Sequence, residues 1–468
     1  MSETINADSR LCHRCVGEKT LKSTIKKIGT MADCSFCRKR VKTISLDQAA
    51  EIFDKVFDQN FVRTEDEPTG MEYTMSKESD YQWERSGEDI VELLQEVGHI
   101  EPEVAESIRQ LLEDKHFDFD EAAMGEEGDF APDSRYTDRK VESEEFHSEW
   151  RSFEESLKTK SRYFSKRATL TLLTLFNGIH RSTTAGNRPV ILTAGPETSI
   201  TSLFRARVFQ DEGKLVRALE RPDQEIGPPP AAAAVAGRMN ARGISTFYGA
   251  TDREVALSEV RPFVGSRVVT AKFDLLRPIS LLDLEALSEV SASGSLFDDN
   301  HRYQMAKANF LQSLSQKMTA PVLPDAEIFE YLPTQVIAEY LASQVKPELD
   351  GILYPSAQTR NGKNNVVLFY ESSLVEKLTT SDDNAIFVET EIQTADGPEP
   401  EYWVFQRTAP KEEATDATAP FAAGMSQNGS LGDGRIPTLR IDLSSVEVHH
   451  IESVVYKHSD YQVHRSQD

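Results

Sequence analysis

Apolar residues recur every three or four positions through the first third of the chain, as on one face of an α-helix. In segment 46–61 they are Leu46, Ala49, Ala50, Phe53, Val56 and Phe57. Three further segments continue the pattern: 86–98, with Ser86 as its expected helix cap, 102–117, and 148–164, with Trp150, Phe153 and Leu157 as its buried stripe. The acidic, turn-rich stretch 125–145 is expected to form an exposed loop. The pattern therefore predicts a helical domain over residues 45–165.

From about residue 190 the pattern changes to short apolar runs separated by glycine and proline. Segments 266–276, 350–356 and 363–370 have the length and the β-branched content of strands. Helical spacing returns in two segments, 301–318 and 333–345. This mixture predicts an α+β domain with a mixed sheet over residues 190–380.

A C-terminal β extension of two or three strands is predicted over residues 381–468. It is interrupted at 408–436 by a stretch rich in Thr, Ala, Gly and Ser that has no periodicity. We expect this stretch to be disordered, because such a composition cannot bury enough apolar surface to offset the entropy of ordering.

All four cysteines lie near the N-terminus, in two CxxC pairs: Cys12 with Cys15, and Cys34 with Cys37. Each CxxC turn directs two thiolates at one metal ion, so the two pairs complete a tetrahedral zinc site with no open position. Residues 1–44 are therefore predicted to form a structural zinc module. His13 lies inside the first pair and is a competing ligand that four cysteines make unnecessary.

Charge narrows the range of functions. The 468-residue chain has a formal net charge of −25, which disfavours general nucleic-acid binding. Residues 1–42 depart from this balance, because ten Lys/Arg against four Asp/Glu give them a net charge of +6. The sequence shows no signal core and no run of ~20 apolar residues, so we expect a cytoplasmic protein without a membrane span.

The side chains best suited to catalysis or ligand binding lie in segment 227–260 and in two shorter segments. They are Arg205 and Arg207, then Arg238 and Asn240, then Tyr248 and Glu259, and finally Ser356. A carboxylate, a tyrosine and several arginines are suited to hold a phosphorylated, sugar-bearing ligand and to stabilise positive charge on it. Thr251 and Glu254 form a predicted capping box for the helix that carries Glu259.

These segments resemble the RES-domain family, which is named for an arginine, a glutamate and a serine and includes toxins of bacterial toxin–antitoxin pairs. Arg205, Tyr248 in FYGA, Glu259 in ALSEV and Ser356 in YPSA match the residues of the family pattern. Gly237 and Arg238 match its GRW signature, although Met239 stands at the tryptophan position. The longer N-terminal region resembles the RES subgroup with a HEPN-type N-terminal domain.

The resemblance implies a catalytic domain similar to diphtheria-toxin-like ADP-ribosyltransferases and an enzyme that cleaves the nicotinamide–ribose bond of NAD. Phosphate or water would accept the ADP-ribose, as in an NAD phosphorylase or glycohydrolase. Glu259 would stabilise the oxocarbenium-like centre and Tyr248 would stack on nicotinamide. Arg205 would bind the pyrophosphate or a ribose hydroxyl, and Arg238 would be a second phosphate contact, with Asn240 and Arg207 as further substrate contacts. Ser356 would complete the hydrogen bonding to the nicotinamide-side ribose or to the carboxamide.

Other functions remain open at the level of sequence. ADP-ribose could be transferred to a protein target, and the basic zinc module could bind nucleic acid. Arg109 and His116 have the spacing of HEPN ribonucleases, although both are expected to be exposed helix residues. An antitoxin or regulatory protein is an expected partner of a toxin, and homo-oligomerisation is a further expectation.

Overall fold

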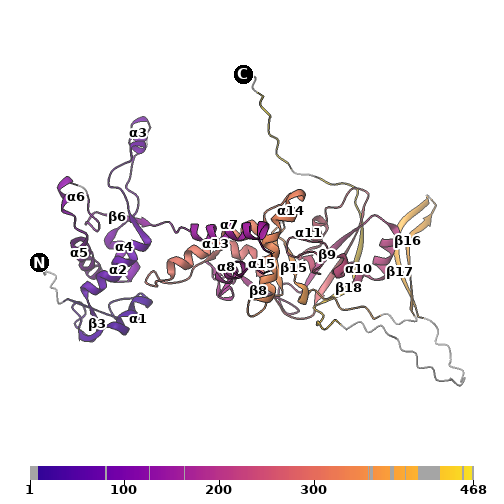
Figure 1. Cartoon of the computed structure of the whole chain (residues 1–468), viewed down its shortest axis with the longest axis horizontal. Coiled ribbons are helices and arrows are strands. Elements are labelled where there is room, and N and C mark those ends of the chain that lie inside the picture. The colour runs from indigo at the N-terminus through magenta and orange to yellow at the C-terminus, as the bar shows by residue number, and fades with distance from the viewer. Residues whose placement is uncertain are drawn as a thin grey trace. The chain divides into compact units, whose positions relative to one another are not determined.

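The computed structural model (Figure 1) describes residues 9–79, 82–125, 127–162, 164–356, 358, 362–379, 384–395, 397–408, 433–455 and 458–465. The chain divides into two compact units. The first comprises Met1–His147 with Ser291–Phe310, and the second comprises Ser148–Val290 with Leu311–Asp468. The division therefore falls within two long helices, α7 (Glu144–Thr159) and α13 (His301–Thr319).

The first unit begins with a small three-stranded sheet of order β1-β3-β2. Its strands are β1 (Arg10–Cys12), β2 (Thr30–Asp33) and β3 (Arg40–Ser45), all antiparallel, with α1 (Lys19–Ile28) between the first two. Leu21 and Ile25 of α1 are buried, which fixes the helix to the core of the unit. Cys12 ends β1 and Cys15 lies in the loop that follows it, whereas Cys34 and Cys37 lie in the loop after β2.

The helices of the first unit include the three that were predicted between residues 46 and 117, which are α2 (Leu46–Asn60), α4 (Ile90–Gly98) and α5 (Pro102–His116). Two further helices were not predicted, α3 (Gly70–Glu78) and α6 (Phe119–Met124). All six apolar residues predicted for α2 are buried. Asp89, and not Ser86, caps α4, because its carboxylate accepts hydrogen bonds from the backbone amides of Val91 and Glu92.

Stretch 125–145 differs from the expected exposed loop. It contains β6 (Arg135–Asp138), which lies between β4 (Phe61–Arg63) and β5 (Glu88–Asp89) in a three-stranded sheet. Phe130 and Tyr136 are buried against α2, whose Phe57 ring contacts both. Burial of these two aromatic side chains helps to order a largely polar segment, whose acidic composition had favoured an exposed loop.

The second unit is built around an eight-stranded sheet of order β18-β11-β9-β10-β15-β14-β12-β8. Its strands are β8 (Ile191–Ala194), β9 (Ser202–Phe209), β10 (Phe247–Ala250), β11 (Arg267–Leu275), β12 (Ile279–Asp283), β14 (Gly351–Pro355), β15 (Asn364–Leu368) and β18 (Leu439–His450). All neighbours are antiparallel except β12 and β14, which are parallel. The α+β class with a mixed sheet is therefore confirmed.

The two faces of this sheet bury different helices. On one face α9 (Glu212–Glu220) and α10 (Pro222–Glu225) cover a large apolar core that includes Leu203, Phe209 and Phe273. On the other face α11 (Arg253–Glu259) packs Val255 and Ala256 against Ala206 and its neighbours. Residues alternate between the faces along each strand, so the strand sequence decides which side each site residue occupies.

The remaining helices of the second unit are α8 (Lys166–Phe176), α12 (Leu284–Ser288), α14 (Glu327–Glu330) and α15 (Leu332–Ser343), besides parts of α7 and α13; α12 and α15 contact β14. The apolar run 169–179 lies largely in α8, whose Leu172 and Leu175 are buried while Leu170 and Leu173 are exposed. Within the described residues, no helix combines the length and apolarity that crossing a bilayer requires.

The C-terminal strands belong to two different sheets. β16 (Asn384–Thr394) and β17 (Gly397–Thr408) form a separate two-stranded hairpin. β18 instead completes the edge of the main sheet by pairing with β11. Most of the stretch predicted to be disordered, 409–432 within 408–436, lies outside the described residues.

Candidate functional site

Strand β10 lies where the main sheet opens. It pairs with β15 along its whole length, from Phe247 opposite Leu368 to Ala250 opposite Asn365. With β9 it shares a single register pair, Ala250 with Phe204, so the two strands separate from that point. Tyr248 lies on the separated part of β10, where a side chain of β9 rather than its backbone meets the Tyr248 carbonyl.

Glu259 reaches this region from the last residue of α11. The helix is capped by Asp252, whose carboxylate accepts from the Glu254 backbone amide. The predicted capping by Thr251 is therefore wrong: its hydroxyl is hydrogen-bonded to the Asn364 backbone instead. Because Val255 and Ala256 are buried, they hold α11 against the sheet and fix the direction of Glu259, which is itself half-buried.

Two side chains from the β14–β15 pair converge on one oxygen of Glu259. The Ser356 hydroxyl, directly after β14, donates to Oε1 at 2.7 Å, and the Asn365 amide, at the start of β15, donates to the same atom at 2.8 Å. Both donors are buried. Among the described residues no group donates to Oε2, so the carboxylate is anchored by one oxygen and presents the other.

Asn365 is a site residue that sequence reasoning missed. The sequence offers one signal: a polar side chain immediately before the apolar run Val366–Leu368 of a central strand, where a buried amide requires a partner. The register places Asn365 opposite Tyr354 on β14 and Ala250 on β10, next to the opening between the strands.

Tyr354, which is half-buried, pairs with Asn365 across β14 and β15, so its side chain lies on the same face of the sheet as the amide that holds Glu259. Burial raises the pKa of Tyr354, and the charges of Tyr248 and Glu259 raise it further, whereas Arg238 opposes them. Burial likewise raises the pKa of Tyr248 to about 12, so its phenol is protonated at neutral pH.

Segment 237–240 is a tight turn locked onto Tyr248. The Tyr248 hydroxyl donates to Asn240 Oδ1 at 2.7 Å and accepts from the Met239 backbone amide at 3.0 Å. The Asn240 amide donates to the backbone carbonyls of residues 235, 241 and 244. Asn240 therefore uses its side chain within the turn, which differs from the predicted substrate contact.

Arg238 projects from this turn and is held from several sides. Its guanidinium donates to the Met318 carbonyl at 2.9 Å and lies 5.2 Å from the centre of the Tyr331 ring. Its carbonyl accepts from Thr334 Oγ1 at 2.6 Å. No carboxylate among the described residues pairs with Arg238, so its remaining N–H groups are available to an anion.

Arg205 approaches the same region from the opposite side of the sheet. It shares the β9 face of Leu203, away from α11, and its guanidinium donates to the Tyr248 carbonyl at 3.1 Å. Burial, with a smaller contribution from the Arg207 charge, lowers its pKa to about 10, so it is still charged at neutral pH. Within the described residues it makes no contact with Glu259.

Arg207 is not brought to Glu259. Its guanidinium donates to the Glu225 carbonyl of α10, and it lines a separate pocket with Lys214 and Arg261. The structure thus brings Ser356 and Asn365 to Glu259 and joins Tyr248 to the turn that carries Arg238. It links Arg205 to the Tyr248 backbone and leaves Arg207 outside.

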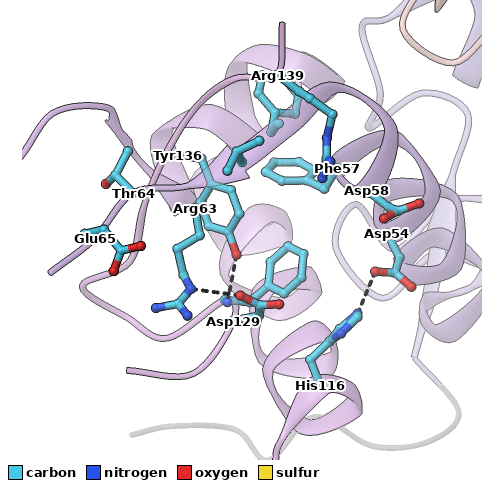
Figure 2. Close-up of a pocket in the computed structure, with 13 residues that line it drawn as sticks. Asp54, Phe57, Asp58, Arg63, Thr64, Glu65, His116, Asp129, Tyr136 and Arg139 are labelled. Carbon is cyan, nitrogen blue, oxygen red and sulfur yellow. Dashed lines mark hydrogen bonds and ion pairs between the residues drawn. The ribbon is translucent and has the colours of Figure 1, made fainter. Parts of the chain in front are cut away.

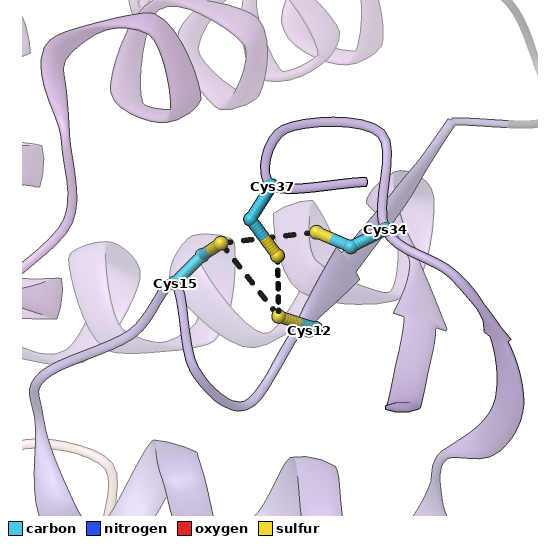
Figure 3. Close-up of side chains that lie close together, drawn as sticks. All are labelled: Cys12, Cys15, Cys34 and Cys37. Atoms are coloured by element: carbon cyan, nitrogen blue, oxygen red, sulfur yellow. Dashed lines mark hydrogen bonds between the residues drawn. The ribbon is translucent and has the colours of Figure 1, made fainter. Parts of the chain in front are cut away.

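The four cysteines form a second candidate site, in the first unit (Figure 3). All four Sγ atoms lie within 4.8 Å of one another, with closest separations of 3.6, 3.6 and 3.8 Å. Thiolates at ~2.3 Å from a tetrahedral zinc ion would lie about 3.8 Å apart, so the arrangement fits this metal. The His13 ring contacts the Lys42 carbonyl at 3.2 Å and is not part of the cluster.

The helical part of the first unit contains a pocket of about 280 Å³ beside Arg63 (Figure 2). His116 lies at its edge and pairs with Asp54 at 2.7 Å. Arg109 does not line it and is 4% exposed, so the expected exposed position of Arg109 is wrong. Its guanidinium bonds Glu106, Glu113 and the Phe130 carbonyl, which gives Arg109 a structural role.

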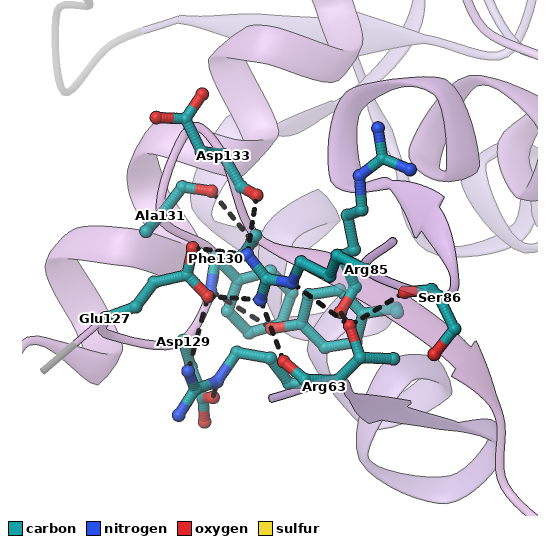
Figure 4. A network of polar contacts seen from close by, with 12 residues as sticks. Arg63, Arg85, Ser86, Glu127, Asp129, Phe130, Ala131 and Asp133 are labelled. Carbon is teal, nitrogen blue, oxygen red and sulfur yellow. Dashed lines mark hydrogen bonds and ion pairs between the residues drawn. The ribbon is translucent and has the colours of Figure 1, made fainter. Parts of the chain in front are cut away.

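A second arginine network holds the segment beside this pocket (Figure 4). Arg85 binds Glu127 through two N–H groups, at 2.9 and 2.5 Å, and Arg63 bonds Asp129 at 2.8 Å. The hydrogen bonds from Arg85 lower the pKa of Glu127, despite its partial burial. The paired charges reduce the repulsion within this acidic segment and act together with the buried rings of Phe130 and Tyr136.

Comparison with known families agrees with this architecture. The RES domain model matches residues 214–385, and the HEPN/RES N-terminal domain 1 model matches residues 27–170. No curated protein matches the chain. The chain therefore combines a RES domain with a HEPN-type domain. It belongs to the RES family, in the group with an N-terminal HEPN-type domain.

The matched ranges cover the site residues unevenly. Tyr248, Glu259 and Ser356 lie inside the RES match, whereas Arg205 precedes it. Cys34 lies inside the N-terminal match and Cys12 before it. The RES family is associated with NAD-processing enzymes, which supports an enzymatic role for this chain.

Proposed function

We propose that the chain cleaves the nicotinamide–ribose bond of NAD at Glu259. One observation carries the proposal: Glu259 Oε1 is fixed by Ser356 and Asn365, while Oε2 has no donor among the described residues. A carboxylate held in this way can accept a hydrogen bond from a ribose hydroxyl and stabilise the positive charge that develops on the ribose. The Glu259 carboxylate is already oriented by its two donors, so it does not need to reorient as the nicotinamide–ribose bond breaks.

The surrounding residues suit the rest of the substrate. Tyr248 and Tyr354 offer aromatic surface for the nicotinamide ring next to Glu259. Arg238 offers free N–H groups for the pyrophosphate, and Arg205 supports the backbone of Tyr248 from behind. In this proposal Ser356 and Asn365 are positioning residues for Glu259, and Asn240 positions Tyr248.

The open arrangement of strands and the position of the carboxylate are compatible with a diphtheria-toxin-like ADP-ribosyltransferase domain. Phosphate or water would take the ADP-ribose, and depletion of cytoplasmic NAD would make the protein a toxin or defence effector. Transfer to a protein target is the alternative. A zinc ion held by the four cysteines would supply folding energy to the first unit and no catalysis.

Incubation of the purified, zinc-loaded protein with NAD, with and without inorganic phosphate, tests the proposal. Mass spectrometry should show free nicotinamide together with ADP-ribose or its 1-phosphate. Unchanged NAD under both conditions, with the protein folded, would contradict the proposal. Biotin-labelled NAD in a cell lysate would reveal labelled protein bands only if a protein is the acceptor.

A further inference from the structure

Two pockets in the second unit flank the 237–240 turn, and their linings differ in charge: one has carboxylates and no cation, whereas the other has two cations and two carboxylates. The first, the Arg238 pocket, has a volume of about 490 Å³ and is lined by Arg238 and Lys317 together with apolar side chains of α13, α15 and the segment between them. The second, the acidic pocket, has a volume of about 390 Å³ and is lined by Glu339, Glu348 and other carboxylates, with no cation in its lining. Both volumes lie in the range of small-molecule sites, ~300–1,000 Å³.

A dinucleotide carries its negative charge in the middle, on the pyrophosphate. The acidic pocket would repel that group, whereas the Arg238 pocket presents Arg238 and Lys317, neither of which is paired with a carboxylate in the described part of the chain. The two acidic lining residues are Glu154 and Glu330, and Glu330 is paired with Lys158 at 2.7 Å, so a single carboxylate of the lining stands against the two cations. The electrostatics therefore select the Arg238 pocket.

The walls of the Arg238 pocket suit a flat, apolar ring system. Leu314 and Met318 of α13, Val322 in the following segment and Pro333 of α15 supply apolar surface. Leu314 and Met318 are buried and Val322 is half-buried. A few charged groups at the edge of an apolar cavity are typical of sites that bind a heterocycle with a phosphate attached.

The turn that carries Arg238 connects this pocket to the region of Glu259. The Arg238 carbonyl accepts from Thr334, and its guanidinium donates to the Met318 carbonyl. The next residue, Met239, donates its backbone amide to the Tyr248 hydroxyl. Tyr248 lies on β10, which pairs with the strand of Asn365, the donor to Glu259. A substrate with nicotinamide at Tyr354 would pass its pyrophosphate by Arg238 and extend its other half into the pocket.

We infer that the Arg238 pocket binds the adenosine half of the dinucleotide substrate. This inference rests on the proposed function. It gives a binding site to the adenosine half of the substrate, which Glu259 and its donors Ser356 and Asn365 would not contact. It follows that most of the discrimination between dinucleotide and mononucleotide substrates arises at the pocket, remote from the reacting bond.

Nicotinamide mononucleotide provides the decisive comparison, because it has the same scissile bond and lacks adenosine. The variants Val322→Trp and Ala326→Trp each fill the pocket from a half-buried position, and Ile328→Trp enlarges an exposed residue of the same segment outside the lining. We expect the filling variants to lower kcat/KM for NAD by about tenfold or more and to leave kcat/KM for the mononucleotide within about twofold. The control variant should leave both values unchanged.

The outcomes separate the two levels of the proposal. If the wild type consumes neither substrate, the proposed function fails. If the wild type consumes NAD and the filling variants keep the same NAD-to-mononucleotide ratio, or lose both activities equally while folded, the pocket assignment is overturned and the proposed function stands. Photolabelling of the wild type with 8-azido-NAD checks the assignment without any variant. Label on peptides from residues 314–334 supports it, and label confined to other peptides overturns it.

Discussion

The hydroxyl of Ser356 donates a hydrogen bond of 2.7 Å to Oε1 of Glu259, although 97 positions separate the two residues in the chain. Asn365 donates to the same oxygen from the adjoining strand. The carboxylate is therefore oriented by two donors from the sheet, while α11 fixes its backbone. This asymmetry between the two carboxylate oxygens is the basis of the catalytic role proposed for Glu259.

Replacement of Glu259 by Gln should abolish most NAD cleavage and retain the fold. The amide oxygen of Gln can still accept from Ser356 and Asn365, whereas the negative charge that stabilises the transition state is lost. We expect kcat to fall by about 10²–10³-fold, the usual effect of removing one preorganised electrostatic contact. Nicotinamide release measured by chromatography gives the rate.

Glu254→Gln is the matched control for this variant. Glu254 lies on the same helix, is exposed, and makes no side-chain contact with the site among the described residues. It should keep wild-type activity. Turnover by Glu259→Gln at the wild-type rate would remove Glu259 from its proposed role.

Replacement of Asn365 by Asp should change the pH dependence of the reaction. The new carboxylate would lie where the Asn365 amide now lies, 2.8 Å from Glu259 Oε1. A like charge at this distance raises the pKa of the pair, so Glu259 would be ionised only at higher pH. We expect the rising limb of the kcat profile to move to higher pH, with activity recovering as the pH increases.

Asn364→Asp is the control, because Asn364 neighbours Asn365 on β15 and its side chain projects to the other side of the sheet. Its pH profile should match that of the wild type. An unshifted profile for Asn365→Asp, with the variant folded, would show that the ionisation of Glu259 does not limit the rate.

Local patterns in the sequence were sufficient for several elements of the fold. The apolar spacing of residues 46–61 predicted the buried face of α2 correctly, because one helical face decides which side chains are removed from water. The α+β class followed in the same way. The order of strands in the main sheet did not follow, because pairing across more than 150 residues, as between β11 and β18, leaves no mark on local spacing.

The misses share a physical cause. Asn365, Arg109 and Phe130 are polar, charged or isolated apolar residues whose burial depends on partners distant in sequence. Arg109 is buried because Glu106 and Glu113 share its helix and the Phe130 carbonyl meets it from another segment. A motif spacing with His116 could not distinguish that structural role from a catalytic one.

Removal of the metal should unfold the N-terminal part of the first unit and leave the second unit intact. Cys34→Ser takes away one of four thiolates, and a structural zinc site of this kind commonly contributes ~10–16 kcal/mol of binding energy to folding. We expect one zinc per wild-type chain by atomic absorption and less in the variant. Hydrogen exchange should then increase in peptides from residues 9–45.

Ser35→Ala, next to Cys34 and outside the cluster, is the control and should retain zinc. Full zinc content in Cys34→Ser would contradict a four-cysteine site. NAD cleavage should persist in the metal-free protein, because the Glu259 cluster lies entirely in the second unit.

Replacement of Gly237 by Ala should disturb the turn that holds Tyr248. A Cβ atom at this position would lie 2.7 Å from both Asn240 Oδ1 and the Tyr248 hydroxyl, too close for either to remain in place. Overpacking of this kind costs about 1–3 kcal/mol. We expect a lower thermal midpoint and a higher KM for NAD, because Arg238 belongs to the same turn. Gly186→Ala, whose Cβ would meet only Thr184 Oγ1 at 3.7 Å, should change neither value.

Loss of the Glu127 charge should make the first unit less stable at neutral pH and less sensitive to acid. Arg85 lowers the pKa of Glu127 in the folded state, so the pair contributes stability above the unfolded pKa of ~4.3 and loses it as the pH falls through the lower folded value. Hydrogen exchange of peptides from residues 60–139, measured between pH 7 and pH 3, should therefore show a smaller pH dependence in Glu127→Gln. Glu103→Gln, exposed on α5, should behave as the wild type does. An equally steep acid response in Glu127→Gln would assign the loss of stability to other carboxylates.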